Sequence, residues 1–172
     1  MAKRSRSDLT QAEVKELLRY EADTGLFYWL VERGSIQLGQ VAGWRSGKAP
    51  NIYIIITING YYYRAHRLAW FYVHGRWPLD QIDHIDGSGV NNCIGNLREA
   101  TCSENLRNMR LTCRNTSGVK GVFWDKERNA WLVRIRSNGR YRHVGRFANL
   151  ACAATAYRDA AAREYGEFAR FE

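Results

Sequence analysis

The stretch of sequence that decides the fold is residues 81–108, QIDHIDGSGVNNCIGNLREATCSENLRN. Residues 81–85 at its start predict a short strand. The glycines and the serine of residues 86–89 predict a turn, and residues 96–99 predict a second short strand. The stretch therefore begins as two strands joined by a loop.

A helix is predicted to follow the second strand. Thr101 and Glu104 have the spacing of a capping box, with Thr101 as the N-cap and Glu104 at the third helical position. Asn105 then lies just inside the helix. The result is a strand–loop–strand–helix finger that is small enough to bring Asp83 and Asn105 together.

Four side chains of this finger form a spaced motif. Asp83 and His84 are adjacent, Asn96 follows His84 by twelve residues, and Asn105 follows Asn96 by nine. In order and spacing they resemble the HNH nuclease motif, the ββα-metal finger of phage and intron-encoded homing endonucleases. The resemblance implies that His84 is the general base, that Asp83 and Asn105 hold one divalent cation, and that Asn96 is structural and ties the loop to the finger. Many relatives have a histidine where this chain has Asn105.

The residue types suit hydrolysis of a phosphodiester, which needs an activated water, a clamp on the phosphate and help for the leaving oxygen. A neutral histidine can take the proton of water at pH 7. A carboxylate with an amide oxygen is a hard ligand pair, which suits Mg²⁺ or Mn²⁺ better than Zn²⁺. The alternative is a turn-rich loop in which Asp83 caps a strand end and His84 is a surface residue, and the full motif favours the nuclease.

The composition points to a polyanionic partner. The net charge is +9 and the pI is about 9.7, which indicates nucleic acid first and an anionic membrane surface second. No stretch approaches the ~20 consecutive apolar residues of a membrane span. The basic residues 3–6 have no apolar segment behind them, so no secretory signal is expected and the cytoplasm is the expected location. By the resemblance, the protein would be phage-encoded and act in a bacterial host.

The cysteines give no zinc pattern. Cys93, Cys102, Cys113 and Cys152 include no Cys-x-x-Cys pair, which some nucleases of this class use for a structural zinc. Three of them lie around the finger and could still converge, but free reduced thiols are the expected state. No small-molecule cofactor is indicated, and the oligomeric state stays open, with a monomer compatible with the sequence.

Residues 10–64 predict one helix and a hairpin ahead of the finger. Thr10 and Glu13 form a capping box before a short amphipathic helix, and residues 27–31 predict a strand. Asn59-Gly60, between a β-branched run and a tyrosine run, predicts a hairpin turn. The many aromatic residues here are interpreted as packing rather than as a DNA-facing surface.

A helix over residues 67–74, closed by Gly75, leads into the finger. His66 and Arg67 precede or begin this helix, and the resemblance to HNH proteins extends back to about Thr10. Either residue could support the active site or contact phosphate. For His66 a packing role is favoured.

The C-terminal part has a different composition. Residues 128–148 contain six arginines and no acidic residue. Three strands are predicted over residues 121–125, 130–137 and 140–145, and an alanine-rich helix over residues 150–165. Alternation places Trp131, Val133 and Ile135 on one face of the middle strand, and Arg134 and Arg136 on the other. Arg140 and Arg142 are expected to line the same basic face.

This part resembles the AP2 DNA-binding domain over residues 117–171, in SGVKGV (117–122), WLVRIR (131–136) and the alanine-rich helix. The resemblance implies a sheet in the major groove whose arginines and tryptophans contact DNA. Phe123 replaces a base-contacting arginine of that family, so no base preference is carried over. The DNA-binding residues expected here are Arg134, Arg136, Arg140, Arg142 and Trp124, and the alternative is a solvated basic face.

The sequence therefore predicts an α+β protein in two modules. Residues 1–115 would be an HNH nuclease domain with its finger at about 81–110, and residues 116–172 an AP2-like domain of three antiparallel strands packed on one helix. The predicted function is metal-dependent cleavage of double-stranded DNA. The alternatives are a non-catalytic DNA-binding regulator with a relic finger, and an RNA-binding protein. The intact motif favours the enzyme.

Overall fold

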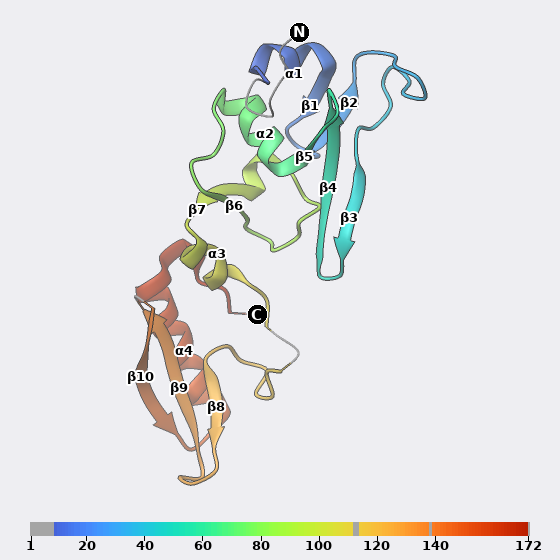
Figure 1. Ribbon diagram of the computed structural model, residues 1–172. Helices are drawn as coiled ribbons and strands as arrows, with labels where there is room; N and C mark the ends of the chain where they lie inside the picture. The colour runs from blue at the N-terminus through green and yellow to red at the C-terminus, as the bar shows by residue number, and fades with distance from the viewer. Residues whose placement is uncertain (1–8, 112–113, 138, 172) are drawn as a thin grey trace. The chain divides into compact units, whose positions relative to one another are not determined.

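The computed structural model describes residues 9–111, 114–137 and 139–171. The chain divides into two compact units, residues 1–102 and 103–172, whose helices and strands are labelled in Figure 1. Each unit has its own hydrophobic core. Both units combine helices with small antiparallel sheets. The predicted α+β class is therefore confirmed. No helix among the described residues is long and apolar enough to cross a membrane.

The first unit begins with α1 (Gln11–Leu17) and the hairpin of β1 (Leu18–Glu21) and β2 (Leu26–Trp29). The predicted capping box is present, because Thr10 and Glu13 exchange hydrogen bonds at the start of α1. Gly25 turns the chain between the two strands with φ of 71°. Glycine is required there, since a Cβ atom would lie 2.4 Å from the carbonyl carbon of Asn92.

The centre of this unit is the sheet of β3 (Trp44–Lys48), β4 (Asn51–Ile58) and β5 (Tyr61–Arg64), followed by α2 (Ala65–His74). The predicted Asn59-Gly60 turn is confirmed, with positive φ at both residues. Gly75 ends α2 in the left-handed conformation, as predicted. Leu68 of α2 packs with Ile56 of β4 in the core. The helix therefore covers one face of the sheet.

The finger stretch forms β6 (Gln81–His84), a 3₁₀ turn η2 (Ile94–Asn96) and β7 (Leu97–Ala100), and α3 (Cys102–Asn108) follows. The two strands are antiparallel and place Asp83 opposite Arg98, and His84 opposite Leu97. The predicted strands and helix are thus confirmed to within a residue or two. Most of α3, including Asn105, belongs to the second compact unit.

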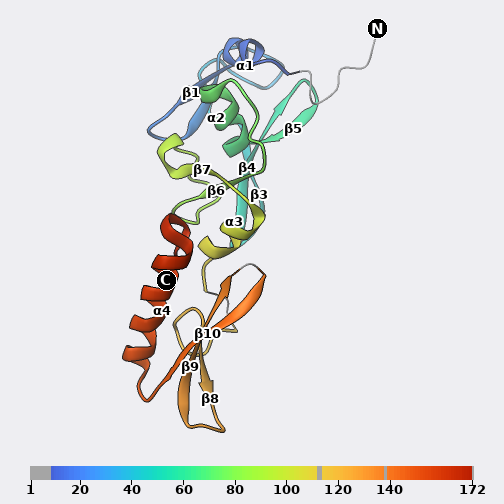
Figure 2. The ribbon, with the colours of Figure 1, turned by 90° about the vertical axis from the view of Figure 1, so that its left-hand side faces the viewer.

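The second unit is a three-stranded antiparallel sheet with a long helix along one face (Figure 2). Its elements are β8 (Val122–Asp125), β9 (Ala130–Ser137), β10 (Arg140–Phe147), α4 (Leu150–Tyr165) and the 3₁₀ turn η3 (Gly166–Phe168), with β9 central. Ala153, Ala160 and Ala161 are buried against the sheet. These small side chains let α4 lie close to the sheet.

The boundary between the compact units lies between residues 102 and 103. The module boundary predicted from the sequence lies later, between residues 115 and 116. The reason is that α3 packs with the second unit. The Arg107 guanidinium lies 4.8 Å from the ring centroid of Tyr165, and Lys120 donates to the carbonyl oxygen of Arg107 at 3.0 Å. A finger helix that the motif assigns to the nuclease thus has its packing partners in the C-terminal part.

Candidate active site and nucleic-acid surface

Asp83 lies on β6 in an ion pair. Arg98, directly opposite on β7, donates from Nε at 2.9 Å and approaches with Nη2 at 2.8 Å, and both contacts are to Oδ2 of Asp83. The two side chains are only 4% and 13% exposed. Sequence reasoning missed Arg98, although pairing the two predicted strands in register would have placed it beside Asp83.

His84 follows Asp83 and is 7% exposed. Its Nε2 atom lies 3.3 Å from Oδ1 of Asn92. Burial lowers the pKa of His84 below its ordinary value of 6.5, and the hydrogen bond with Asn92 and the charges of Asp86 and Asp83 offset only part of this effect. The imidazole is therefore neutral at pH 7, as a proton acceptor must be.

A cluster of rings surrounds His84. His66 meets it edge to face, with ring centroids 4.9 Å apart, and Tyr53 lies 5.5 Å from His66 and 6.2 Å from His84. His66 is 4% exposed, and its Nδ1 has no hydrogen-bond partner among the described residues. Burial, followed by the neighbouring His84, lowers the pKa of His66 to about 3. The predicted packing role is compatible with this neutral, buried ring, and its contact with His84 was not foreseen.

Asn96 binds the loop that follows β6. It accepts from the backbone N–H of Asp86 at 3.0 Å, and its Nδ2 donates to Oδ1 of Asp86 at 3.0 Å and to the carbonyl of Asn91 at 2.9 Å. Burial alone would raise the pKa of Asp86, but hydrogen bonds from Ser88, Asn91 and Asn96 outweigh it and hold that pKa below its usual value. The charged carboxylate therefore stays at the centre of the loop.

Arg67 orders the segment that enters β6. It donates to the carbonyl oxygens of Asp80 at 2.7 Å and Pro78 at 3.3 Å. Two roles are predicted for Arg67, support of the active site and contact with phosphate. These backbone contacts agree with the first role. The contacts lie in the loop directly before the strand that carries Asp83 and His84.

The carboxylate oxygens of Asp83 suit a hard cation. A carboxylate offers about four lone-pair positions on two oxygens, and the Arg98 contacts go to one of them. Within the part of the chain that the structure describes, no group of three or more His, Cys, Asp or Glu side chains is arranged to hold a metal ion. The expected pair uses an amide as its second ligand, and Asn105 lies on α3. Their joint binding of one cation stays a prediction.

The cysteines are free thiols where they are described. Cys93, Cys102 and Cys152 form no disulfide, and Cys93 donates to the carbonyl oxygen of Asp23 at 2.9 Å. Cys113 lies outside the described residues.

Four arginines are predicted on one face of the second unit's sheet, but only Arg134 and Arg136 lie there. Opposite residues of antiparallel strands share a face, and Tyr141 and His143 lie opposite Arg136 and Arg134. Arg142 lies opposite Ile135, which is buried against α4. The expectation that Arg140 and Arg142 line the same face as Arg134 and Arg136 is therefore wrong, because the hairpin register puts them on the opposite face.

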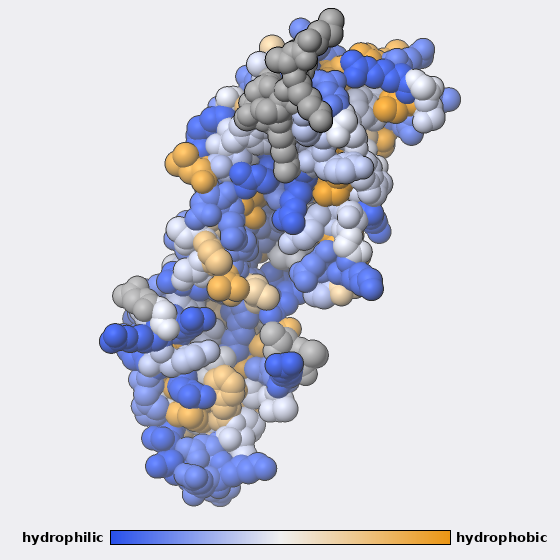
Figure 3. Space-filling view, viewed as in Figure 1, coloured by the Kyte–Doolittle hydropathy of each residue, from blue (hydrophilic) through white to orange (hydrophobic). Residues whose placement is uncertain are grey.

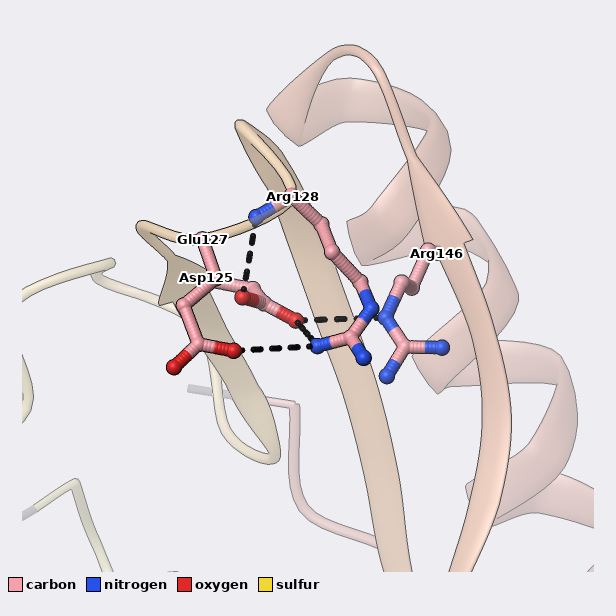
Figure 4. A network of polar contacts seen from close by, with 4 residues as sticks. All are labelled: Asp125, Glu127, Arg128 and Arg146. Carbon is pink, nitrogen blue, oxygen red and sulfur yellow. Dashed lines mark hydrogen bonds and ion pairs between the residues drawn. The ribbon is translucent and has the colours of Figure 1, made fainter.

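Acidic partners for the arginines come from outside residues 128–148. Asp125 binds Arg146 of β10 at 3.2 Å, and its other contact is Arg128 at 3.5 Å (Figure 4). Glu164 of α4 binds Arg142 at 3.1 Å. These three arginines therefore have acidic partners, although residues 128–148 themselves contain no acidic residue. Hydrophilic residues nevertheless cover most of the visible face of this unit (Figure 3).

The exposed sheet face carries a ladder of cations and rings. The Arg134 guanidinium lies 5.0 Å from the ring centroid of Phe123 and 5.6 Å from that of Tyr141, and Arg136 lies 6.0 Å from Tyr141. Flat, exposed cation–π pairs of this kind offer both charge and a stacking surface to a nucleic acid. Phe123 and Tyr141 were not among the predicted DNA-binding residues, and alternation along β8 and β10 could have found them.

Trp124 lies on the other face. It pairs with Trp131 across β8 and β9, and the two rings meet at 5.0 Å between centroids. Trp131 packs against the core beneath α4. Trp124 is 41% exposed, and it lies on the opposite side of the sheet from Arg134 and Arg136. Its contact with DNA stays a prediction.

Comparisons with known proteins agree with the motif. Residues 63–107 match the family model described as HNH endonuclease. Protein 3.8 of Escherichia phage T7 is 39% identical over 110 residues, which are 63% of this chain and 89% of that protein. No solved structure matches the chain. The chain therefore belongs to the same family as Protein 3.8 of phage T7, with an HNH endonuclease domain at residues 63–107.

Proposed function

We propose that this chain is a metal-dependent DNA endonuclease that cuts phosphodiester bonds with His84 as the general base. The observation that carries the proposal is on β6, where a neutral, hydrogen-bonded imidazole follows a buried carboxylate. Both lie within the segment that matches the HNH endonuclease family. Asp83 and Asn105 would hold one Mg²⁺ or Mn²⁺ ion, and no small-molecule cofactor is needed.

The chain's own residues supply the general base, orient the Asp83 carboxylate and fix the loop after His84. His84 takes a proton from the attacking water. Arg98 holds Oδ2 of Asp83 and so orients the carboxylate, while Asn96 keeps the loop after His84 in one conformation. The bound cation would supply charge stabilisation for the phosphate and the departing 3′ oxygen.

The second unit would bring the enzyme to double-stranded DNA. Arg134 and Arg136 stand exposed on one sheet face among Phe123 and Tyr141, an arrangement that supports the AP2-like role proposed for residues 116–172. Contacts of the arginines with phosphates would release counterions and supply affinity. As a relative of a phage protein, the enzyme would act in the cytoplasm of a bacterial host.

One observation favours a non-catalytic regulator instead. Arg98 already neutralises Asp83 in the described structure, which is what a relic site would retain after losing its cation. A regulator of this kind would bind DNA through the second unit and would cut none.

Incubation with supercoiled plasmid separates the two functions. The enzyme should convert plasmid to nicked or linear DNA with Mg²⁺ or Mn²⁺, and EDTA should stop the reaction. His84→Ala should abolish cleavage while DNA affinity stays within a few-fold, because His84 serves the water and not the duplex. Binding without cleavage by the wild-type chain at any divalent cation would favour the regulator. Equal affinity for RNA competitor would favour the RNA-binding alternative.

A further inference from the structure

We infer that Asn92 is the positioning residue of His84, holding the imidazole proton on Nε2 so that Nδ1 is the atom that accepts a proton from water. The inference deepens the proposed function and rests on it for its catalytic consequence. Its structural part concerns a tautomer and stands without catalysis.

The orientation of the Asn92 amide decides the tautomer. Asn92 is 2% exposed, and its Nδ2 donates to the carbonyl oxygen of Val90 at 3.4 Å. A carbonyl oxygen only accepts, so the amide nitrogen must face Val90 and Oδ1 must face His84. Because Oδ1 also only accepts, Nε2 of His84 at 3.3 Å must be the donor. A neutral imidazole carries one proton, so the lone pair is on Nδ1.

Asn92 is itself held from a distant part of the chain. The hydroxyl of Tyr20 on β1 donates to its backbone carbonyl at 2.7 Å. Gly25 lies so close that a Cβ atom there would be 2.4 Å from the Asn92 carbonyl carbon. The β1–β2 hairpin thus fixes the backbone from which the amide reaches His84, and this gives the hairpin a part in the site.

Neighbouring rings hold the imidazole in the plane that this bond needs. His66 contacts the His84 ring edge to face at 4.9 Å, and Tyr53 lies at 6.2 Å. Flipping the His84 ring would put a carbon atom opposite Oδ1 of Asn92 and would leave a buried amide oxygen without its donor, which is unfavourable. Packing and hydrogen bonding therefore favour the same rotamer.

The arrangement has a direct consequence for the reaction. As the water oxygen bonds to phosphorus and the bond to the 3′ oxygen breaks, the water proton passes to Nδ1 and solvent protonates the departing oxygen. The imidazolium that forms keeps its Nε2–H bond to Asn92, whose amide oxygen stabilises the new charge. The proton then returns to solvent. Asn92 touches no reacting atom and acts through His84.

The test is NMR of the full chain with ¹⁵N-labelled histidine at a pH where His84 is neutral, with each of the four histidines assigned by substitution. We expect His84 to carry its proton on Nε2. Asn92→Leu removes the acceptor and should produce a mixture of the two tautomers, whereas Asn92→Asp keeps an acceptor oxygen and should retain Nε2–H. Asn51→Leu, at an exposed position of β4, is the matched control and should change neither tautomer nor rate.

Kinetics give the second readout. Single-turnover cleavage should fall on the order of tenfold or more in Asn92→Leu, with recovery in Asn92→Asp and unchanged DNA affinity in both. A proton on Nδ1 in the wild type would overturn the inference without any variant. An unchanged tautomer in a folded Asn92→Leu protein would also overturn it. Nε2–H in a chain that cuts no DNA would leave the tautomer standing and refute the proposed function alone.

Discussion

His66 is a buried histidine whose pKa lies far below its ordinary value. Its ring is buried against His84 and Tyr53, and its pKa is about 3 because of burial and the adjacent His84. In the unfolded chain the pKa returns to about 6.5. The unfolded state therefore binds more protons than the folded state between these two values, and folding loses stability as the pH falls through that window.

The free energy of unfolding should thus decrease with acidification below about pH 6.5, with a contribution from His66 that approaches about 1.4 kcal/mol per pH unit. His66→Gln should flatten the dependence, because the replacement does not titrate. His74→Gln, on the same helix but exposed, should keep it. Urea unfolding at a series of pH values measures the slopes, and equal slopes in the two variants would contradict the assignment to His66.

Arg98 allows a second test at the scale of single residues, which asks whether Asp83 is a cation ligand. Arg98→Leu removes the ion pair with the buried Asp83 carboxylate, which should cost about 3–5 kcal/mol of stability. If Asp83 is a cation ligand, Mg²⁺ or Mn²⁺ should then raise the melting temperature of Arg98→Leu more than that of the wild type.

The control is Arg76→Leu, which removes an exposed ion pair with Glu99. It should cause no cation-dependent gain. Calorimetry with and without the cation measures all three proteins, and no response in Arg98→Leu would show that Asp83 is not a ligand.

At the scale of elements, strand register decides which arginines lie on the exposed face of the second unit's sheet. The irregularity between His143 and Gly145 on β10 shifts the pairing by one residue, so that Arg146 lies opposite Leu132. Arg146 therefore shares the face of Arg134, and Asp125 binds it there. Arg142, before the irregularity, turns toward Glu164 of α4. The four arginines expected on one face become two pairs on two faces.

Two double variants, one at Arg134 and Arg136 and one at Arg140 and Arg142, can therefore be compared directly. Replacing Arg134 and Arg136 with alanine should weaken DNA binding and lower the slope of log K against log salt, by roughly 0.9 for each phosphate that the variant no longer neutralises. Replacing Arg140 and Arg142 removes the same charge from the other face and should change affinity and slope less. Salt titrations of the two double variants give the comparison. Equal losses would mean that net charge, and not the sheet face, provides the binding.

At the scale of the whole molecule, α3 lies almost entirely within the HNH match but packs with the C-terminal part. It carries Asn105, within the HNH match, yet Arg107 packs on Tyr165 and accepts from Lys120. The C-terminal part thus supports a helix that the nuclease motif needs, in addition to its proposed role in DNA binding.

A chain ending after Arg114 should therefore lose more than DNA affinity. Removing Tyr165 and Lys120 takes away packing partners of α3, so cleavage should stay defective even at saturating DNA. The Arg134, Arg136 double-alanine variant keeps those partners and should recover cleavage as DNA is raised. Rates at increasing DNA concentration measure both, and full recovery by the truncated chain would show that α3 is formed without the C-terminal part.

The sequence by itself determined the features that depend on neighbouring residues. The Thr10 cap, the Asn59-Gly60 turn and the end of α2 at Gly75 follow from side chains a few positions apart, and so does alternation along β9. The motif of Asp83, His84 and Asn96 has the same local character, since its order and spacing are readable in one stretch. Local conformational preference and periodicity are sufficient for such features.

Only the tertiary structure decided which groups meet across long separations. Asn92 is fixed by Tyr20, seventy-two residues away in sequence, and His66 reaches His84 because α2 and β6 share one core. The separation of Arg142 from Arg134 follows from the register of the β9–β10 hairpin, and a change of one residue in register reverses the face of every side chain. Burial and register arise from packing of the whole chain, and no pattern within a single stretch specifies them.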